Sequence, residues 1–391
     1  FAGIRSVDVE LVELPSRLHQ QDFFSVLPTH RILHRMLGAQ ENALLRASAG
    51  LCCYGQRFSH WAGNSTAFIH AYDRFGVDFE GVNFYQYWLK AKSDGLKVSL
   101  DEFNLGAVAA RQGRHIVFDE IANTFSHASS GYHFNAKAYI SAVARAAVIE
   151  GLKHRASLVE HVSIKDGQIQ SLRLADGTEI TADLYIDASG TEAALIRTLE
   201  FNNFESNFES KNFESSNLES WEEYLPTNRL IVASAPVLEP LPGFSQISAF
   251  AEGWIGLYPL LNRTGVNIAY STKYTNSVAA LERAVALTGL NITDPTESHF
   301  TACTRKKHWI GNCVALGSSA TSLEPLDATQ LHVLHLGLSL LRSLFPADKN
   351  TMPEANIYNE KMRVNVENVR DFQIAHFHLN KRYGDPFWDK S

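Results

Sequence analysis

One stretch in the last third of the chain restricts the fold more than any other. Residues 313–317 read CVALG, a short apolar segment that ends in a glycine. The loop LEPLDAT follows at 323–329, and leucines then crowd 329–344 at helical spacing until Pro346 ends the pattern. A buried strand, a glycine turn and a buried helix in this order predict an α/β fold. Its backbone and helix N-terminus can approach a cofactor such as a flavin, or an anion such as a halide.

Other segments fit the same class. Helical spacing predicts helices over residues 28–37 and 135–151. Strand patterns occur at residues 7–14, 157–164, 169–174, 179–186, 230–236 and 265–270. The segment 179–186 leads into Asp187-Ala-Ser-Gly190. Gly190 would let the backbone approach a cofactor closely, and an ordinary loop glycine is an equal alternative.

Glu13 closes the first strand pattern. In a dinucleotide-binding fold the second strand ends in an acid that binds the adenosine ribose, and Glu13 fits this role. The glycine-rich turn expected about 20 residues earlier is absent, because the sequence begins at Phe1. We therefore expect that the sequence is truncated, with Phe1-Ala-Gly-Ile as the end of a first helix.

Composition and net charge argue against several classes of binding partner and site. The 391 residues are 45% hydrophobic with a net charge of -7, which does not favour nucleic acid or an anionic membrane. We interpret Arg305-Lys-Lys307 as a solvated face rather than a phosphate site. The four cysteines form neither a zinc pattern nor a disulfide framework, so we expect no metal and a cytoplasmic location. No apolar run has a membrane-spanning length, and no signal peptide is visible.

Two regions lack clean periodicity. Residues 50–130 mix aromatic residues, histidines and glycines, as is typical of an inserted substrate or cap module. Residues 201–220 repeat the motif NFES or NLES four times, which we interpret as a surface insertion or a flap that contacts a partner.

Five dispersed motifs resemble the flavin-dependent tryptophan halogenases, in the family's order and across nearly the whole chain. They are QYWLK (86–90), GYHFNA (131–136), ADLYIDASG (182–190), NCVALGSSATSLEPLDAT (312–329) and the segment from RDF (370–372) to DPFW (385–388).

The resemblance implies a glutathione-reductase-type, Rossmann-like FAD-binding domain with an inserted sheet and a helical substrate module. We expect the FAD-binding domain at 1–50, 131–200 and 301–346, the substrate module at 51–130, 221–300 and 347–391, and an insertion at 201–220. FAD reduced by a separate flavin reductase would form a hydroperoxide, which oxidises chloride or bromide in true halogenases. The substrate would be a small aromatic or carrier-bound molecule, and a homodimer is an option.

The resemblance also suggests site residues. Those near FAD are Glu13, Pro28, Ser189, Gly190, Gly317, Ser318, Thr329, Gln330 and Leu331. Those near the substrate are Trp254, Tyr258, Phe387 and Trp388. The catalytic positions are Asp327 and Cys53. For Asp327 the alternative is a simple helix cap worth about 1 kcal/mol.

The chain departs from the family at the positions that carry its chemistry. Cys53 replaces the family's lysine, and a thiol cannot act as an ammonium group; a buried packing residue is the simpler interpretation of Cys53. Asp327 replaces a glutamate, and Gln330 replaces a glycine, where its side chain would fill the halide site or bind flavin. Gly256 replaces the second tryptophan of the family's WxWxIP signature, which would open a route from substrate to flavin.

Three functions remain. The first is a flavin-dependent enzyme that oxygenates an aromatic substrate, or halogenates it without the lysine. The second is a classical tryptophan halogenase, against which Cys53 argues. The third is a non-catalytic partner protein that binds flavin weakly or not at all.

Overall fold

The computed structural model describes residues 7–62, 67–116, 128–205 and 217–390, which form two compact units. The first unit comprises residues 1–18, 143–225 and 300–378, and the second comprises 19–142, 226–299 and 379–391. These boundaries differ from the expected ones. Residues 19–50 belong to the second unit because its strand Phe23–Val26 pairs with Gly131–Asn135. Residues 347–378 belong to the first unit, where they form a helix that packs on the leucine-rich one.

The first unit contains short strands and three helices within its described residues. Its strands are β1 (Glu10–Glu13), β7 (Lys153–Ala156), β8 (Val159–Lys165), β9 (Gln168–Leu174), β10 (Glu179–Ile180), β11 (Tyr185–Asp187), β12 (Leu218–Ser220), β18 (Cys303–Arg305), β19 (Trp309–Ile310), β20 (Cys313–Ala315) and β21 (Thr321–Ser322). Its helices are α6 (Ile196–Glu205), α8 (Thr329–Ser343) and α9 (Glu354–His378), with 3-10 turns η2 (Gly190–Glu192) and η4 (Gly317–Ser319).

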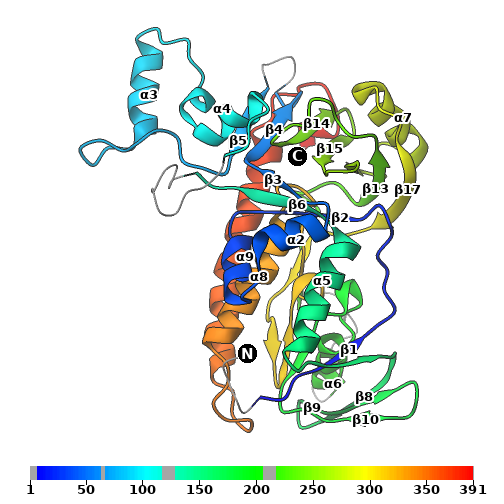
Figure 1. Ribbon diagram of the computed structural model, residues 1–391. Helices are drawn as coiled ribbons and strands as arrows, with labels where there is room; N and C mark the ends of the chain where they lie inside the picture. Colours follow the sequence, from blue (N-terminus) through cyan, green and yellow to red (C-terminus); the bar gives the residue numbers. More distant parts are fainter. Residues whose placement is uncertain (1–6, 63–66, 117–127, 206–216, 391) are drawn as a thin grey trace. The chain divides into compact units, whose positions relative to one another are not determined.

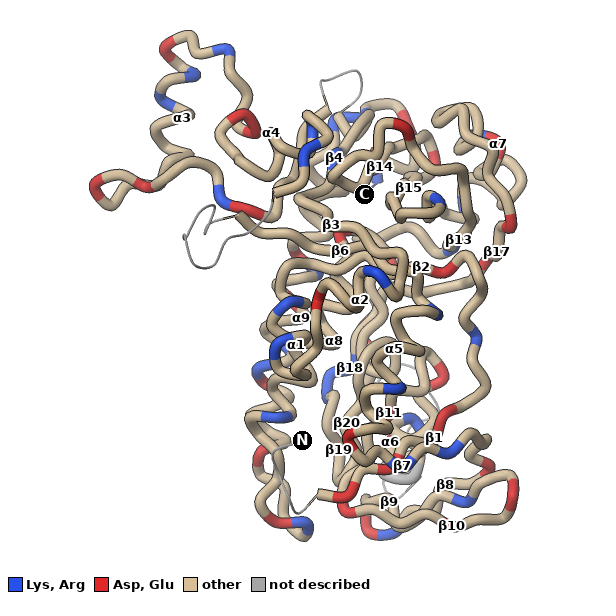
Figure 2. Tube along the Cα trace, in the orientation of Figure 1, with Lys and Arg blue, Asp and Glu red and all other residues tan. Residues whose placement is uncertain are grey.

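Two packed surfaces hold the first unit together. Apolar residues of β9, β11, β20 and α6 share one core, with Ile169, Leu172 and Leu199 at its centre. Helix α9 runs beside α8 (Figure 1) and buries a stripe of residues about four apart. These residues are Tyr358, Met362, Val366, Gln373 and Phe377. The charged side chains of α9 lie on its other faces, and Figure 2 shows them spread along the helix.

The second unit contains a large sheet. Its strands are β2 (Phe23–Val26), β3 (Leu51–Cys53), β4 (Gly55–Ser59), β5 (Phe68–Ala71), β6 (Gly131–Asn135), β13 (Arg229–Ala235), β14 (Ser245–Phe250), β15 (Gly253–Pro259), β16 (Thr264–Tyr270) and β17 (Thr293–His299). Its helices are α1 (His30–Met36), α2 (Glu41–Ala47), α3 (Phe84–Ser93), α4 (Leu105–Arg111) and α7 (Ser277–Thr288), with η1 (Leu100–Phe103) and η5 (Trp388–Lys390). Helix α5 (Ala136–Ile149) contributes residues to both units.

Seven strands of the second unit form one sheet in the order β17-β13-β16-β15-β14-β4-β5. Every pairing in it is antiparallel except that of β14 with β4. Apolar residues of its central strands pack against α7, and Ile255, Ile268 and Ala284 are fully buried. A second sheet, β2-β6-β3, brings the segment GYHFN of β6 beside Cys53.

Most predicted elements form where the periodicity places them. The helices predicted at 28–37, 135–151 and 329–344 appear as α1, α5 and α8. The strand predicted at 179–186 is wrong in one respect, because it breaks into two strands in different sheets. β10 closes the hairpin with β9, whereas β11 runs parallel to β20.

The two ends of the four-fold repeat at 201–220 lie in different elements. Residues 203–205 of its first copy lie in α6, and residues 218–220 of its last copy form β12, which pairs with β18. Residues 206–216 between them, like residues 1–6, lie outside the described part of the chain. Within that part no helix is long and apolar enough to cross a membrane.

Candidate functional site

Two neighbouring strands of the first unit end in glycine turns. β11 and β20 pair in parallel, with Asp187 opposite Ala315. Each strand then turns at a glycine with positive φ, +78° at Gly190 and +66° at Gly317. Because parallel strands have their carboxyl ends at the same edge, the turns η2 and η4 lie next to each other.

Both turns leave room at their glycines. No heavy atom outside the immediate chain neighbours lies within 4 Å of the position that a Cβ at Gly190 would take, among the residues described. At Gly317 the nearest such atom is Leu334 Cδ1, at 4.0 Å. The main chain is therefore accessible at both turns.

Asp187 fixes the first of these turns, a role that the sequence reasoning missed. Its carboxylate accepts from the main-chain N–H groups of Leu195 and Ile196, each at 2.9 Å, and from the hydroxyl of Ser189 at 2.6 Å. It thereby caps α6, since these N–H groups have no partner within the helix. The Ser189 hydroxyl also accepts from Ala194 N–H at 2.8 Å, so it holds the turn itself.

A loop from Leu323 to Ala328 leads from η4 into α8, and α9 holds it from behind. The buried amide of Gln373 donates to the carbonyls of Glu324 and Leu326 and to the hydroxyl of Thr329, at 2.8 to 3.1 Å. Buried carbonyls need such partners, because leaving them bare costs about 1–3 kcal/mol. Thr329, predicted to lie near flavin, has its hydroxyl turned toward this loop.

Asp327 lies immediately before the helix and does not cap it. Ala328 is the N-cap residue of α8, and its side chain makes no capping hydrogen bond. Both Asp327 and Ala328 have left-handed backbone angles, with φ of +62° and +58°. The alternative that Asp327 is only a helix cap is therefore wrong.

The carboxyl of Asp327 lies 2% exposed, and neither of its oxygens makes a hydrogen bond within the described residues. Burial, with the negative charge of nearby Glu324, raises its pKa to about 8. Its Oδ2 lies 3.2 Å from Nε2 of His376 on α9, but the two groups are not aligned for a hydrogen bond. Such a carboxyl is protonated at neutral pH and can give up or take a proton beside an imidazole.

Three of the remaining residues predicted near FAD, namely Gln330, Ser318 and Leu331, lie beside the second turn or in the first turn of α8. The other two, Glu13 and Pro28, lie elsewhere in the chain. Gln330 folds back onto the chain, donating to Thr321 O at 2.9 Å and accepting from Leu323 N–H at 3.1 Å, so its amide braces the loop. Ser318 and Leu331 are half-buried beside the second turn and in the first turn of α8. Glu13 is exposed on β1 and bonds to His154 Nε2 at 2.6 Å. Pro28 lies in the second unit, just before α1.

The basic triplet at 305–307 is not simply a solvated face. Arg305 is buried, pairs with the carboxylate of Glu200 on α6, and donates from Nε to Ser319 O at 2.7 Å. Only Lys306 and Lys307 are exposed. Arg305 therefore ties α6 to the turn that follows Gly317, and the solvated-face interpretation of Arg305 is wrong.

Cys53 lies in the second unit, fully buried at the end of β3. Its Sγ lies 3.0 Å from Gly55 O, to which it donates, and 3.8 Å from Ser245 Oγ. The same serine hydroxyl lies 2.9 Å from Nε2 of His133, and Nδ1 of His133 lies 2.9 Å from Pro259 O. Cys53 is buried, as the packing interpretation expects, and a buried histidine and serine lie beside it.

The residues predicted near the substrate are all buried in the second unit. Trp254 is fully buried in β15, and Trp388 donates to Phe250 O at 2.7 Å and stacks edge-on against Phe387. At Gly256 a Cβ would stand 2.6 Å from the ring of Tyr258, so this ring lies against the position where the family has its second tryptophan. The route from substrate to flavin that Gly256 would open stays a prediction.

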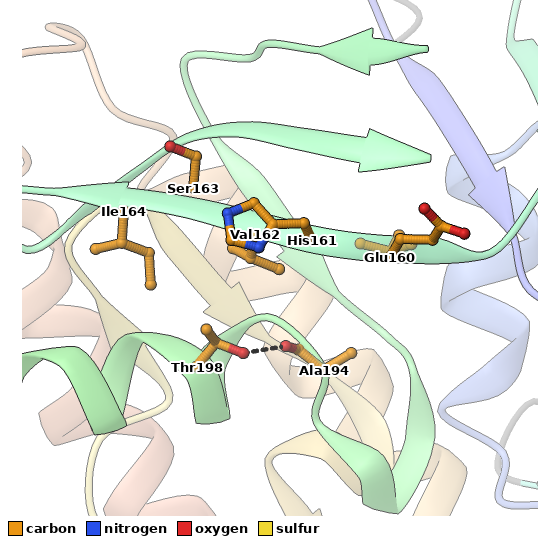
Figure 3. A pocket seen from close by; sticks show the side chains of 8 residues that line it. Glu160, His161, Val162, Ser163, Ile164, Ala194 and Thr198 are labelled. Atoms are coloured by element: carbon orange, nitrogen blue, oxygen red, sulfur yellow. Dashed lines mark hydrogen bonds between the residues drawn. The ribbon is translucent and has the colours of Figure 1, made fainter. Parts of the chain in front are cut away.

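A groove of about 500 Å³ lies elsewhere in the first unit. Residues of β8 line it, together with Thr198 of α6 and Ala194, which lies just before this helix (Figure 3). His161 and Glu160 point along the edge strand and make no contact with each other in this view. None of the residues predicted for the site lines this groove.

The fold defines the class of protein. A mixed α/β architecture with this arrangement is the FAD-binding Rossmann-like fold of flavin-dependent halogenases. The family model described as tryptophan halogenase matches residues 3–391, so the chain belongs to the tryptophan halogenase family.

Solved structures and curated relatives agree with this assignment. A flavin-dependent halogenase from Xanthomonas campestris superposes with a TM-score of 0.89 at 26% identity, covering 99% of this chain and 75% of that one. A flavin-dependent halogenase from Brevundimonas sp. BAL3 gives 0.87 at 26% identity, with the same coverage. The tryptophan 7-halogenase of Lentzea aerocolonigenes is 28% identical over 265 residues, which are 66% of this chain and 47% of that protein. The matched region thus spans about half the length of that relative.

Proposed function

We propose that this chain is a flavin-dependent halogenase that uses FAD and acts on an electron-rich aromatic substrate. The observation that carries the proposal is the pair of open glycine turns at the ends of two parallel strands, directly ahead of α8. Family membership and the curated relatives named as tryptophan halogenases support it.

The two turns fit a flavin. Gly190 and Gly317 leave space where any other residue would place a Cβ, so a flat ring or a pyrophosphate can approach the main chain. Ser318 and the first turn of α8, which includes Leu331, would complete the cradle. Bound FAD, reduced by a separate reductase, would supply the reaction with oxygen that turns a halide into an electrophile.

Helix α8 begins at an N-cap residue, Ala328, whose side chain makes no capping hydrogen bond. Its first N–H groups and its partial positive charge would attract an anion such as chloride or bromide, or electron-rich atoms of the flavin.

Asp327 and His376 would handle protons. With a pKa of about 8, the Asp327 carboxyl is protonated near neutral pH and can donate a hydrogen bond to a substrate atom. The imidazole 3.2 Å away can accept the proton that an aromatic ring loses during substitution. Gln373 is a positioning residue, because it holds the loop that carries Asp327.

The test is a reaction with a flavin reductase, NADH, oxygen, bromide and indole-like probes, analysed by mass spectrometry. We expect bromine in the product, with strict dependence on FAD. His376→Gln should lower turnover at least tenfold, since general acid–base groups contribute roughly 100-fold or more. His378→Gln, on the exposed side of the same helix, is the matched control and should have no effect.

One observation favours a second candidate, which is direct oxygenation. Cys53 stands where the family's lysine would direct the halogen, and a thiol cannot do this. Oxygen without bromine in the product would support oxygenation. Neither product, from a protein that takes up no FAD, would favour a non-catalytic partner protein.

A further inference from the structure

Cys53, His133 and Ser245 form a buried cluster in the second unit, on three different strands. Strand pairing sets it up, because Cys53 at the end of β3 lies opposite Gly131 on β6, two residues before His133. All three side chains are at most 1% exposed. They form a thiol, a base and a hydroxyl within reach of one another.

A main-chain carbonyl determines the tautomer of His133. Nδ1 of His133 faces Pro259 O at 2.9 Å, and a carbonyl can only accept, so the proton of the neutral ring sits on Nδ1. Nε2 then carries the lone pair and points at the Ser245 hydroxyl, 2.9 Å away. That hydroxyl lies 3.8 Å from the Cys53 sulfur. The ring is therefore held as a base toward the serine and the thiol.

The electrostatics agree with this geometry. Burial raises the pKa of Cys53, but its interactions with His133, Gly55 and Ser245 outweigh burial, so the pKa lies below its ordinary value. The neighbouring Cys52 behaves in the opposite way. Burial and the carboxylate of Glu41 raise the pKa of Cys52 to about 11. Burial also raises the pKa of the other two cysteines, Cys303 and Cys313.

We propose that Cys53 is a redox-reactive cysteine, activated by His133 and Ser245, that small peroxides oxidise to a sulfenic acid. Because Cys53 is fully buried, we restrict the proposal to the smallest peroxide, hydrogen peroxide. The reaction needs neither flavin nor halide, so it stands independently of the proposed halogenase activity.

The step balances with peroxide as the oxidant. The thiol proton passes to the Ser245 hydroxyl, which passes its own proton to Nε2 of His133, and the thiolate attacks one oxygen of hydrogen peroxide. An S–O bond forms as the O–O bond breaks, the sulfur is oxidised by two electrons, and the proton on His133 converts the leaving hydroxide to water. A thiol reductant reverses the change, as it does for other sulfenic acids.

The test compares the two adjacent cysteines in the same protein. The purified full chain is treated with a limiting amount of hydrogen peroxide, and the oxidised residue is located by peptide mass spectrometry. We expect one added oxygen on Cys53 before any on Cys52, although Cys52 is the more exposed. This order needs no variant and so does not depend on any variant folding.

Variants then test the role of the histidine. His133→Gln should slow the oxidation of Cys53 about tenfold or more, because one pKa unit changes the thiolate fraction tenfold. Ser245→Ala should slow it less, and Cys52→Ser should leave it unchanged. Oxidation of Cys52 first, or an equal rate at Cys53 in a folded His133→Gln variant, would overturn the proposal.

Discussion

At the scale of single residues, Asp327 is an acidic side chain in a buried environment that disfavours its charged form. Asp327 is held in a left-handed backbone conformation, and its buried carboxyl has no hydrogen bond from the part of the chain that the structure describes; both features cost stability. Proteins retain such groups mainly at functional sites, where a shifted pKa suits proton transfer.

The cost predicts how stability depends on pH. The folded-state pKa of about 8 lies above the ordinary value of 3.8, so between these values the folded protein holds a proton that the unfolded chain has lost. Stability should therefore fall as pH rises through this window, by at most about 1.4 kcal/mol per pH unit. Asp327→Asn removes this titrating group. In urea unfolding, the free energy of unfolding of the variant relative to that of the wild type should therefore increase from about pH 5 to about pH 8. An equal advantage at both pH values would contradict the shifted pKa.

Asp327 was recognisable from the sequence, but its chemistry was not. The phrase LEPLDAT placed it at the start of a helix, where an aspartate commonly caps. The left-handed turn and the packing of α9 over the loop are tertiary features that no local pattern reports. Cys53 is similar, because its partners His133 and Ser245 come from distant strands.

At the scale of elements, α9 holds the loop before α8 through one amide. Gln373→Met keeps the shape of the side chain but leaves the carbonyls of Glu324 and Leu326 without this donor. We expect a loss of about 2–4 kcal/mol in the free energy of unfolding, measured in urea. Glu360→Gln on the exposed side of α9 is the control and should change stability by less than about 0.5 kcal/mol. If Gln373→Met lost no more stability than this control, the loop would not depend on the amide of Gln373.

Arg305 links α6 to the second glycine turn through a buried ion pair with Glu200. Removing one partner leaves the other charge buried and alone, which typically costs about 3–5 kcal/mol. Arg305→Met should therefore destabilise the protein strongly, and adding Glu200→Gln should recover part of the loss. Lys306→Ala at the adjacent exposed position should be neutral. Full additivity of the two substitutions would mean that the pair is not coupled.

At the scale of the whole molecule, periodicity predicted the main helices and strands because most of them bury one regular face. It missed the break between β10 and β11, because the four residues 181–184, Thr-Ala-Asp-Leu, contain no glycine or proline that would indicate the end of a strand. It also misjudged Arg305, since a run of basic residues carries no sign of which one finds a buried carboxylate. The domain boundaries likewise depend on pairings such as β2 with β6, between segments about a hundred residues apart.

The central claim is that the turns at Gly190 and Gly317 form the cradle for FAD. Gly317→Ala adds a Cβ into the open space of the cradle and strains a backbone with φ of +66°. Gly289→Ala is a matched control for the strain, because it has φ of +67° and open space at the end of α7, far along the chain.

The most direct measurement is the FAD dissociation constant of the purified protein and these two variants, followed by flavin fluorescence. The account predicts that the wild type and Gly289→Ala bind FAD alike, whereas Gly317→Ala binds at least about tenfold more weakly, a loss of about 1.4 kcal/mol. Equal binding by a folded Gly317→Ala variant, or no FAD binding by the wild type, would contradict the cradle and the function proposed from it.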